Sequence, residues 1–233
     1  MRETARQIST SMIPLITLDH VRSALDLKDF DSRAALQRMA PAPRGWQKRD
    51  SPPHPAAIMI LIYPGPDEIL HTALTLRAAE LRGHSGQVSF PGGRPDPGDE
   101  NLTATARRET FEEIGVCGER LSIFGHFPQF YIPASHHDVC PTIAYFDGMP
   151  AFVPNPDEVA EIFSLSLEDL LRPRYKFVEQ RRIRGFEVRV PYYMARGHKV
   201  WGATAMLLSE LEQRLRRVLP PGVLLELSKA DEA

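Results

Sequence analysis

The stretch FPGGRPDPGDENLTATARRETFEEIGV, Phe90 to Val116, opens with a Pro-Gly-Gly turn and crosses a polar loop before it becomes helical. Asn101 is a good N-cap for that helix, and Gly115 stands where helices often end in a left-handed residue. Residues three or four apart on a helix are neighbours. The spacing therefore predicts a helix from Asn101 or Leu102 to Gly115 with three glutamates on one face: Glu109, Glu112 and Glu113.

Three carboxylates on one helical face carry an electrostatic cost. Like charges at this spacing destabilise a helix by about a few tenths of a kcal/mol per pair, so a bound cation is expected to compensate. Hard divalent ions such as Mg²⁺ or Mn²⁺ prefer oxygen ligands. Oxygens of Glu109 and Glu113 can meet at one ion, while Glu112 can bridge a second ion or hold a water. Without its surroundings, the same pattern also fits a solvated acidic helix face.

This run resembles the signature of the Nudix hydrolases. That signature reads Gly, five residues, Glu, seven residues, and then Arg-Glu-aliphatic-any-Glu-Glu-any-Gly-aliphatic. Gly93 opens the match, Arg108-Glu109 and Glu112-Glu113 form its core, and Gly115-Val116 close it. The resemblance implies an α/β/α sandwich with a mixed β-sheet. It also implies metal-dependent hydrolysis of a diphosphate, with the carbonyl of Gly93 as a further metal ligand.

The match departs from the signature in two places. The loop before Arg108 is one residue longer, so the first Glu of the signature falls on Asp99 or Glu100. Thr110 occupies a position that is usually aliphatic. Arg108 is expected to orient one of the carboxylates, and the alternative is a surface ion pair worth about 0–1 kcal/mol.

A second motif lies directly upstream. LTLRAAELRGHSGQVSFPGG, Leu74 to Gly93, resembles the additional motif of the coenzyme A pyrophosphatase branch of the Nudix family, as do PNPDEVAEIF and VWGATA further on. This resemblance implies a coenzyme A or acyl-CoA substrate, cut into 3′,5′-ADP and the (acyl-)4′-phosphopantetheine portion. It also suggests substrate-binding residues, which are Arg77, Arg82, His84 and Gly86. Arginine forks onto phosphate oxygens, although a solvated basic loop is the alternative.

The attacking water needs a base. Glu112 or Glu113 can take its proton if the metal leaves them free, and Glu158 in PNPDEVAEIF is a third candidate. Two other functions stay open: a Nudix pyrophosphatase for ADP-ribose, NADH or another nucleotide, and a ligand-sensing Nudix module that does not cleave. The second alternative usually accompanies eroded carboxylates, whereas all three are present here.

Composition excludes several classes of protein. The 233 residues are 25% charged and 42% hydrophobic with a net charge of −2, which is typical of a soluble globular protein. The small net charge gives no reason to expect a nucleic-acid or membrane partner. The longest apolar run, residues 56–63, is too short to span a bilayer. The N-terminus lacks the apolar core of a secretory signal, so a cytoplasmic protein is expected.

The chain divides into a helical N-terminal extension with a proline-rich arm, residues 1–55, and a Nudix domain, residues 56–233. Helices are expected near residues 18–25, with Thr17 as N-cap, and 31–39; the extension could mediate a partner or homodimer contact. In the domain we expect strands near 56–63, 71–77, 121–130, 139–146, 161–166 and 185–193, a helical turn at 167–171 and a helix over 201–219.

Overall fold

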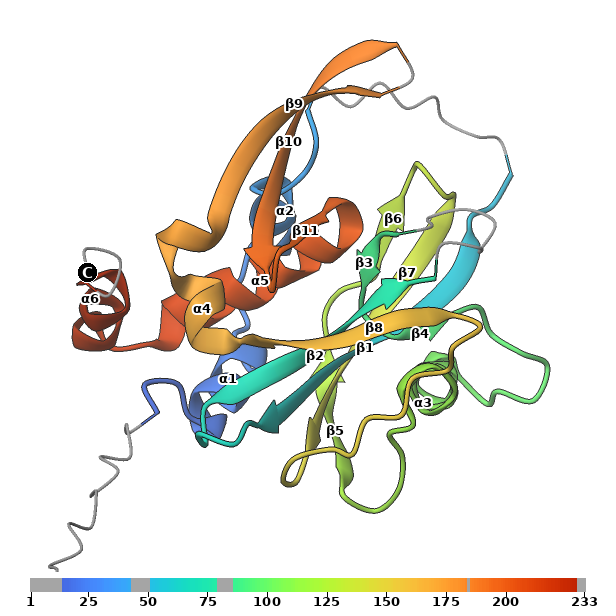
Figure 1. Ribbon diagram of the computed structural model, residues 1–233, viewed down its shortest axis with the longest axis horizontal. Helices are drawn as coiled ribbons and strands as arrows, with labels where there is room; N and C mark the ends of the chain where they lie inside the picture. Colours follow the sequence, from blue (N-terminus) through green and yellow to red (C-terminus); the bar gives the residue numbers. More distant parts are fainter. Residues whose placement is uncertain (1–13, 43–50, 79–85, 184, 230–233) are drawn as a thin grey trace, which may run out of the picture.

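The structure is a computed structural model that describes residues 14–42, 51–78, 86–183 and 185–229 (Figure 1). Two residues predicted to bind substrate, Arg82 and His84, lie outside the described residues. No helix in the described ranges is long and apolar enough to cross a membrane.

A mixed sheet occupies the centre of the molecule. β1 (His54–Pro64) pairs antiparallel with β2 (Leu70–Arg77) and parallel with β7 (His137–Phe146). β8 (Val159–Ser166) extends the sheet beyond β2, and β5 (Leu121–His126) extends it beyond β7. Three short strands complete it: β3 (Val88–Ser89), β4 (Gly92–Gly93) and β6 (Phe130–Ile132).

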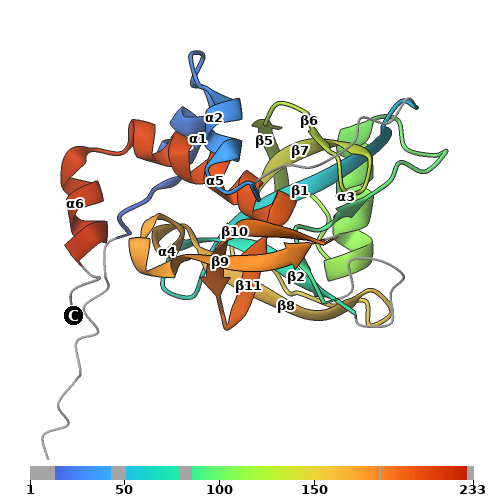
Figure 2. The same ribbon diagram turned by 90° about the horizontal axis from the view of Figure 1, so that it is seen from above.

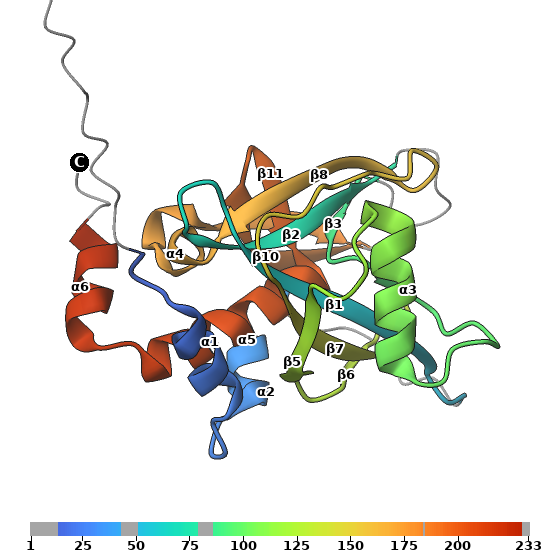
Figure 3. The same ribbon diagram turned by 90° about the horizontal axis from the view of Figure 1, so that it is seen from below.

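Strand β1 is buried on both faces because helices cover the sheet from both sides. Met59 and Leu61 belong to the apolar cluster beneath α3 (Leu102–Ile114). Ile60 and Ile62 belong to a second cluster with residues of α5 (Gly202–Val218). A strand covered on both faces needs a nearly continuous apolar run, which explains AAIMILIY. Figures 2 and 3 show α3 and α5 on either side of the sheet, so the predicted α/β/α arrangement is confirmed.

The two N-terminal helices pack against α5. In α1 (Leu18–Leu25) the predicted N-cap Thr17 accepts from the backbone N–H of His20 at 3.4 Å. The guanidinium of Arg214 on α5 donates to the carbonyl of Ala24 at 3.2 Å. The carbonyl of Ala35 in α2 (Ser32–Gln37) accepts from the Ser209 hydroxyl at 2.8 Å. These contacts join the extension to the apolar cluster on the α5 side of the sheet.

Strands β1 and β2 separate at one end, and the segment 88–93 fills the opening. They pair from Ile62–Thr72 to Pro64–Leu70. Beyond that point β3 pairs with β2, and β4 pairs with β1 at Ala57 and Ile58. A Cβ on Gly92, which has φ 156°, would come within 2.7 Å of the Ile58 Cα, so only glycine fits there. The opening places Gly93 directly beneath α3.

Several elements differ from the sequence-based expectation. The single strand expected over 121–130 is wrong: it divides into β5 and β6, because Pro128 has no N–H to donate to a ladder. The strand at 185–193 corresponds to β10 (Phe186–Ala195), whose neighbours β9 (Lys176–Ile183) and β11 (His198–Trp201) were not predicted. After α4 (Leu167–Leu171) comes a 3₁₀ turn, η1 (Pro173–Tyr175). A further helix, α6 (Pro221–Lys229), follows α5.

Candidate active site

Helix α3 carries the predicted carboxylates and begins and ends as its sequence indicates. The Asn101 side chain accepts from the backbone N–H of Ala104 at 3.0 Å. Gly115 ends the helix with φ 74°. Thr110, in place of an aliphatic residue, is fully buried and donates its hydroxyl to the carbonyl of Ala106 at 2.6 Å. The hydroxyl is therefore satisfied within the helix, and this departure from the signature does not disturb packing.

Glu113 is the most deeply buried of the three glutamates, with 1% of the residue exposed. Its Oε1 lies 3.7 Å from Nη1 of Arg77, at the end of β2. Its Oε2 has no hydrogen-bond partner within the described residues. Burial raises the pKa of Glu113 to about 8, with Arg77 acting in the opposite direction. A buried carboxylate oxygen without a partner is costly, so this position favours a cation.

Glu109 lies against the glycine turn. A Cβ on Gly93 would come within 2.7 Å of Glu109 Oε2, so the carboxylate approaches the backbone only because residue 93 is glycine. Burial raises the pKa of Glu109, while the hydrogen bond from Arg108 lowers it. Gly93 therefore packs against Glu109.

Arg108 joins the loop to the helix. Its guanidinium donates to Asp99 Oδ2 at 2.9 Å, Glu109 Oε1 at 2.9 Å and Glu112 Oε2 at 2.8 Å. These carboxylates hold the pKa of Arg108 above its usual value, with Asp99 as the largest cause. The Arg108 hydrogen bond holds the pKa of Asp99 well below its usual range. Of the two acids that the sequence left open, Asp99 contacts Arg108 and Glu100 is exposed.

Glu112 and Glu158 differ in their position at the site. The Glu112 side chain is 48% exposed, and the contact described for it is the one to Arg108. Glu158 lies in the loop between β7 and β8, and its carbonyl accepts from the N–H of Ala78 at 2.9 Å. In the same loop the N–H of Asn155 donates to the carbonyl of Glu113 at 3.0 Å. The carboxylate of Glu158 is close enough to raise the pKa of both Glu109 and Glu113.

Gly86 turns the chain back toward β2. It adopts φ 67°, and its N–H donates to the carbonyl of Arg77 at 3.2 Å. Because L side chains rarely adopt this conformation, glycine suits the turn. Gly86 thus contacts the end of β2, where Arg77 lies beside Glu113.

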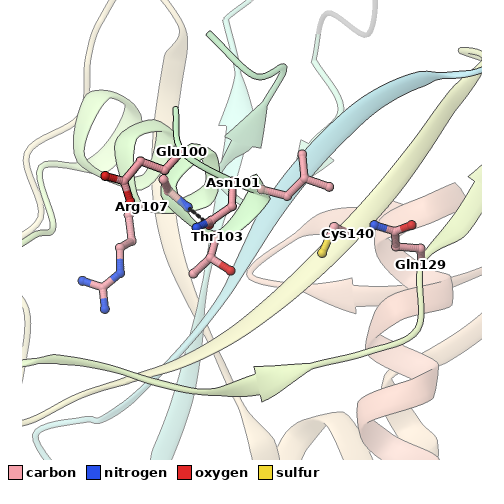
Figure 4. A pocket seen from close by; sticks show the side chains of 8 residues that line it. Glu100, Asn101, Thr103, Arg107, Gln129 and Cys140 are labelled. Atoms are coloured by element: carbon pink, nitrogen blue, oxygen red, sulfur yellow. Dashed lines mark hydrogen bonds between the residues drawn. The ribbon is translucent and has the colours of Figure 1, made fainter. Parts of the chain in front are cut away.

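A separate hollow lies at the start of α3 and was not predicted. It encloses about 610 Å³, and Figure 4 shows its polar lining. The lining residues are Glu100, Asn101, Leu102, Thr103, Ala104, Arg107, Gln129 and Cys140. Glu109 and Glu113 are not among them, so the hollow is distinct from the carboxylate site. Burial raises the pKa of the Cys140 thiol, which opposes thiolate chemistry there.

The described residues fit a divalent cation that takes only a few of its ligands from the protein. No group of three or more His, Cys, Asp or Glu side chains in the described ranges converges as a ready metal cage, and Arg108 engages Glu109 and Glu112. Mg²⁺, however, usually keeps several waters and takes only one or two carboxylates. The unpartnered Oε2 of Glu113 and the carboxylate of Glu109, which lies against Gly93, are compatible with that smaller requirement.

The fold and the site define a class of protein: an α/β/α sandwich whose carboxylate site is built from a glycine turn, a loop and the helix that follows. A family model described as NUDIX domain matches residues 52–185, more than half of the chain. The uncharacterized Nudix hydrolase NudL of Photorhabdus laumondii is 33% identical over 193 residues, which cover 82% of this chain and 99% of the relative.

Two other proteins are also similar to this chain. Nudix hydrolase 3 of Caenorhabditis elegans is 34% identical over 169 residues, covering 66% of this chain and 69% of that protein. A crystal structure of a Nudix hydrolase from M. smegmatis, RenU, has a TM-score of 0.49 and 21% identity, covering 76% of this chain and 94% of that one. From the family model and the NudL relative, the chain belongs to the Nudix hydrolase family. Nudix hydrolases generally use divalent metal ions.

Proposed function

We propose that this Nudix hydrolase cleaves the diphosphate of coenzyme A or acyl-CoA, giving 3′,5′-ADP and (acyl-)4′-phosphopantetheine. The observation that carries the proposal is the contact between Arg77 and Glu113, with 3.7 Å between Nη1 and Oε1. Arg77 belongs to the motif that resembles the coenzyme A branch, and Glu113 belongs to the Nudix helix. Their contact supports one site in which the residues expected to select the substrate adjoin those expected to cleave it.

The chain's own residues have separate tasks in this reaction. A divalent ion, Mg²⁺ or Mn²⁺, when bound by Glu109, Glu113 and the carbonyl of Gly93, would neutralise phosphate charge and acidify a water. Arg108 holds Glu109 and Glu112 in place through its three carboxylate contacts. These contacts fix the ligands before substrate arrives.

The diphosphate and the attacking water need further groups. Arg77 can shift from Glu113 to a phosphate oxygen, which a guanidinium binds strongly. Arg82, His84 and Gly86 are proposed as the other substrate-binding residues of the same motif. Glu158 is our first choice of general base, since it adjoins both metal-binding glutamates without a described ion pair of its own. Glu112 and Glu113 remain the other candidates for this role.

Two alternatives use the same site. A pyrophosphatase for ADP-ribose, NADH or another nucleoside diphosphate derivative would need the same carboxylates with a different substrate pocket. A ligand-sensing module that does not cleave would not need the buried Glu113. The intact set of Glu109, Glu112 and Glu113 favours catalysis over sensing.

Other properties complete the proposal. We divide the chain into residues 1–55, an extension that could support a homodimer, and residues 56–233, the Nudix domain. A cytoplasmic location and the absence of nucleic-acid and membrane partners stay predictions from the sequence, and a small-molecule substrate is what the family resemblance implies.

A substrate screen tests the proposal directly. Purified protein with Mg²⁺ or Mn²⁺ should be incubated with coenzyme A, acetyl-CoA, ADP-ribose, NADH and diadenosine compounds, and the products identified by mass. Coenzyme A giving 3′,5′-ADP at the highest kcat/KM is the expected result. Faster turnover of another diphosphate would contradict coenzyme A as the substrate but would agree with diphosphate hydrolysis. No turnover of any compound would favour the sensing module.

A further inference from the structure

A second group of basic side chains lies beside the carboxylate site, where the loop leaving β4 meets the starts of β1 and β7. It consists of Arg94, His54, His136 and His137, and we refer to it as the Arg94 cluster. In Figure 1 the start of β1, the turn between β6 and β7, and the loop after β4 lie toward the same end of the sheet. Neither Arg94 nor His54 was among the site residues predicted from the sequence.

The outer part of the cluster is formed by one guanidinium and two imidazole rings. Arg94 Nε donates to His137 Nε2 at 3.0 Å, so His137 accepts with this nitrogen. The rings of His54 and His137 have their centroids 5.8 Å apart. Arg94 and His54 are exposed and His137 is half-buried. A solute can therefore reach all three side chains.

His136 holds this arrangement from beneath. It is 3% exposed and adopts φ 59°, a conformation uncommon for residues with a side chain. Its ring nitrogens contact the Tyr131 hydroxyl at 2.7 Å and the Ser51 hydroxyl at 3.0 Å. Its carbonyl accepts from the N–H of His54 at 2.9 Å. The buried histidine thus fixes the strand start that carries His54 and the turn that leads to His137.

The cluster begins one residue after the glycine of the carboxylate site. Consecutive Cα atoms are about 3.8 Å apart, so the Arg94 side chain starts next to Gly93. The carbonyl of Arg94 accepts from Nη2 of Arg108 at 2.9 Å. The same residue therefore contacts the arginine that orients the carboxylates through its backbone, and His137 through its side chain.

The chemistry of the cluster suits an anion. Its outer side chains supply N–H donors, and Asp138, the next residue along β7, projects to the opposite face of the strand. Among the described residues, no three His, Cys, Asp or Glu side chains come together here in a way that could hold a metal ion. A phosphate monoester carries about −1.5 to −2 charge near pH 7 and three acceptor oxygens. Arginine binds such a group in bidentate fashion.

We propose that Arg94, His54 and His137 form a subsite for a phosphate monoester that the substrate carries close to its diphosphate. In the proposed substrate this group is the 3′-phosphate of the ADP portion, and to that extent the inference rests on the proposed function. Arg94 binds the monoester through its Nη atoms, the exposed imidazole of His54 donates to a remaining oxygen, and His137 positions Arg94 by accepting from its Nε. The subsite distinguishes substrates with the monoester from those without it.

The first test compares two substrates that differ only in this phosphate. kcat/KM is measured for coenzyme A and 3′-dephospho-coenzyme A with wild-type protein, Arg94→Gln and His54→Gln. Arg107→Gln, an exposed arginine on α3, is the matched control. Charged hydrogen bonds of this kind change affinity by about tenfold or more. We expect Arg94→Gln to lower kcat/KM for coenzyme A by about tenfold or more and to keep kcat/KM for dephospho-coenzyme A within about twofold of wild type. The control variant should change neither value.

The second test uses binding and does not depend on turnover. Calorimetry compares 3′,5′-ADP with 5′-AMP, and inorganic phosphate is titrated separately. The subsite predicts tighter binding of 3′,5′-ADP, a preference that Arg94→Gln removes while the control retains it. Equal binding of the two nucleotides by wild-type protein would overturn the inference. Inorganic phosphate alone binding as tightly as 3′,5′-ADP, and weakened equally by Arg94→Gln, would show a free-phosphate site instead.

The two proposals fail in different ways. No cleavage of coenzyme A by the wild-type protein contradicts the proposed function, whereas the binding preference for 3′,5′-ADP still decides the subsite. If wild type cleaves coenzyme A but Arg94→Gln lowers kcat/KM equally for coenzyme A and dephospho-coenzyme A, the subsite is contradicted and the proposed function is kept. Arg94 would then only hold the loop in place and would not bind the monoester.

Discussion

Replacing Glu113 by glutamine should change the pH dependence of stability in the metal-free protein. Burial raises the pKa of Glu113 to about 8, against 4.5 for an ordinary glutamate. The unfolded chain therefore releases this proton at lower pH than the folded chain does. Because the folded state binds more protons between about pH 4.5 and pH 8, its free energy of unfolding falls as the pH rises through that window.

The size of this effect follows from the difference between the two pKa values. Each unit corresponds to about 1.4 kcal/mol, so ionised Glu113 costs the metal-free fold at most about 5 kcal/mol above pH 8. Movement of Arg77, 3.7 Å away, reduces the cost. Glu113→Gln keeps the shape of the protonated acid and removes its ionisation. We expect the variant to match wild type near pH 5 and to exceed it by about 1–5 kcal/mol near pH 9.

Urea unfolding with a chelator present measures this difference at several pH values. Glu112→Gln is the control, because the Glu112 side chain is 48% exposed and its change should leave the wild-type pH dependence in place. Equal loss of stability between pH 5 and pH 9 in wild type and Glu113→Gln would refute the reasoning. Magnesium should then raise the unfolding midpoint of wild type at pH 8 and that of Glu113→Gln much less, since a ligand stabilises only the state that binds it.

Three further predictions concern activity. Glu158→Gln should lower kcat by about 10²–10⁴-fold if Glu158 is the general base, and a loss within about twofold would exclude it from that role. Gly93→Ala should lower activity by about tenfold or more, because its Cβ would displace the Glu109 carboxylate; circular dichroism should show an intact fold, and unchanged kinetics would contradict the assigned contact. A chelator should abolish turnover and added Mg²⁺ or Mn²⁺ should restore it, whereas persistent turnover without metal would contradict a metal-dependent site.

Part of the site could be placed from local sequence because its geometry is local. Asn101 and Gly115 mark the ends of α3 through hydrogen bonds and backbone conformation within a few residues. The spacing of Glu109 and Glu113 then puts both on one side of the helix, whatever the rest of the chain does. The buried strand β1 was also predictable, since a sheet covered on both faces requires a continuous apolar run.

Other features depended on segments that are distant in the chain. The choice between Asp99 and Glu100 required the position of Arg108, because one extra loop residue shifts every side chain that follows it. The Arg94 cluster was missed for a similar reason: His54 and His137 are far apart in sequence and meet only because β1 and β7 pair in parallel. β9, β11 and α6 gave weak local patterns, and propensity is readily overridden by packing.

The sequence by itself determined the acidic helix, the glycine turn before it and the apolar strand beneath it, because each is specified by contacts between residues close in the chain. Only the tertiary structure decided that Glu113 is buried beside Arg77 with one oxygen unpartnered, and that the N-terminal helices pack on α5. Burial and charge pairing depend on which surfaces come together, and periodicity within one segment does not specify its neighbours.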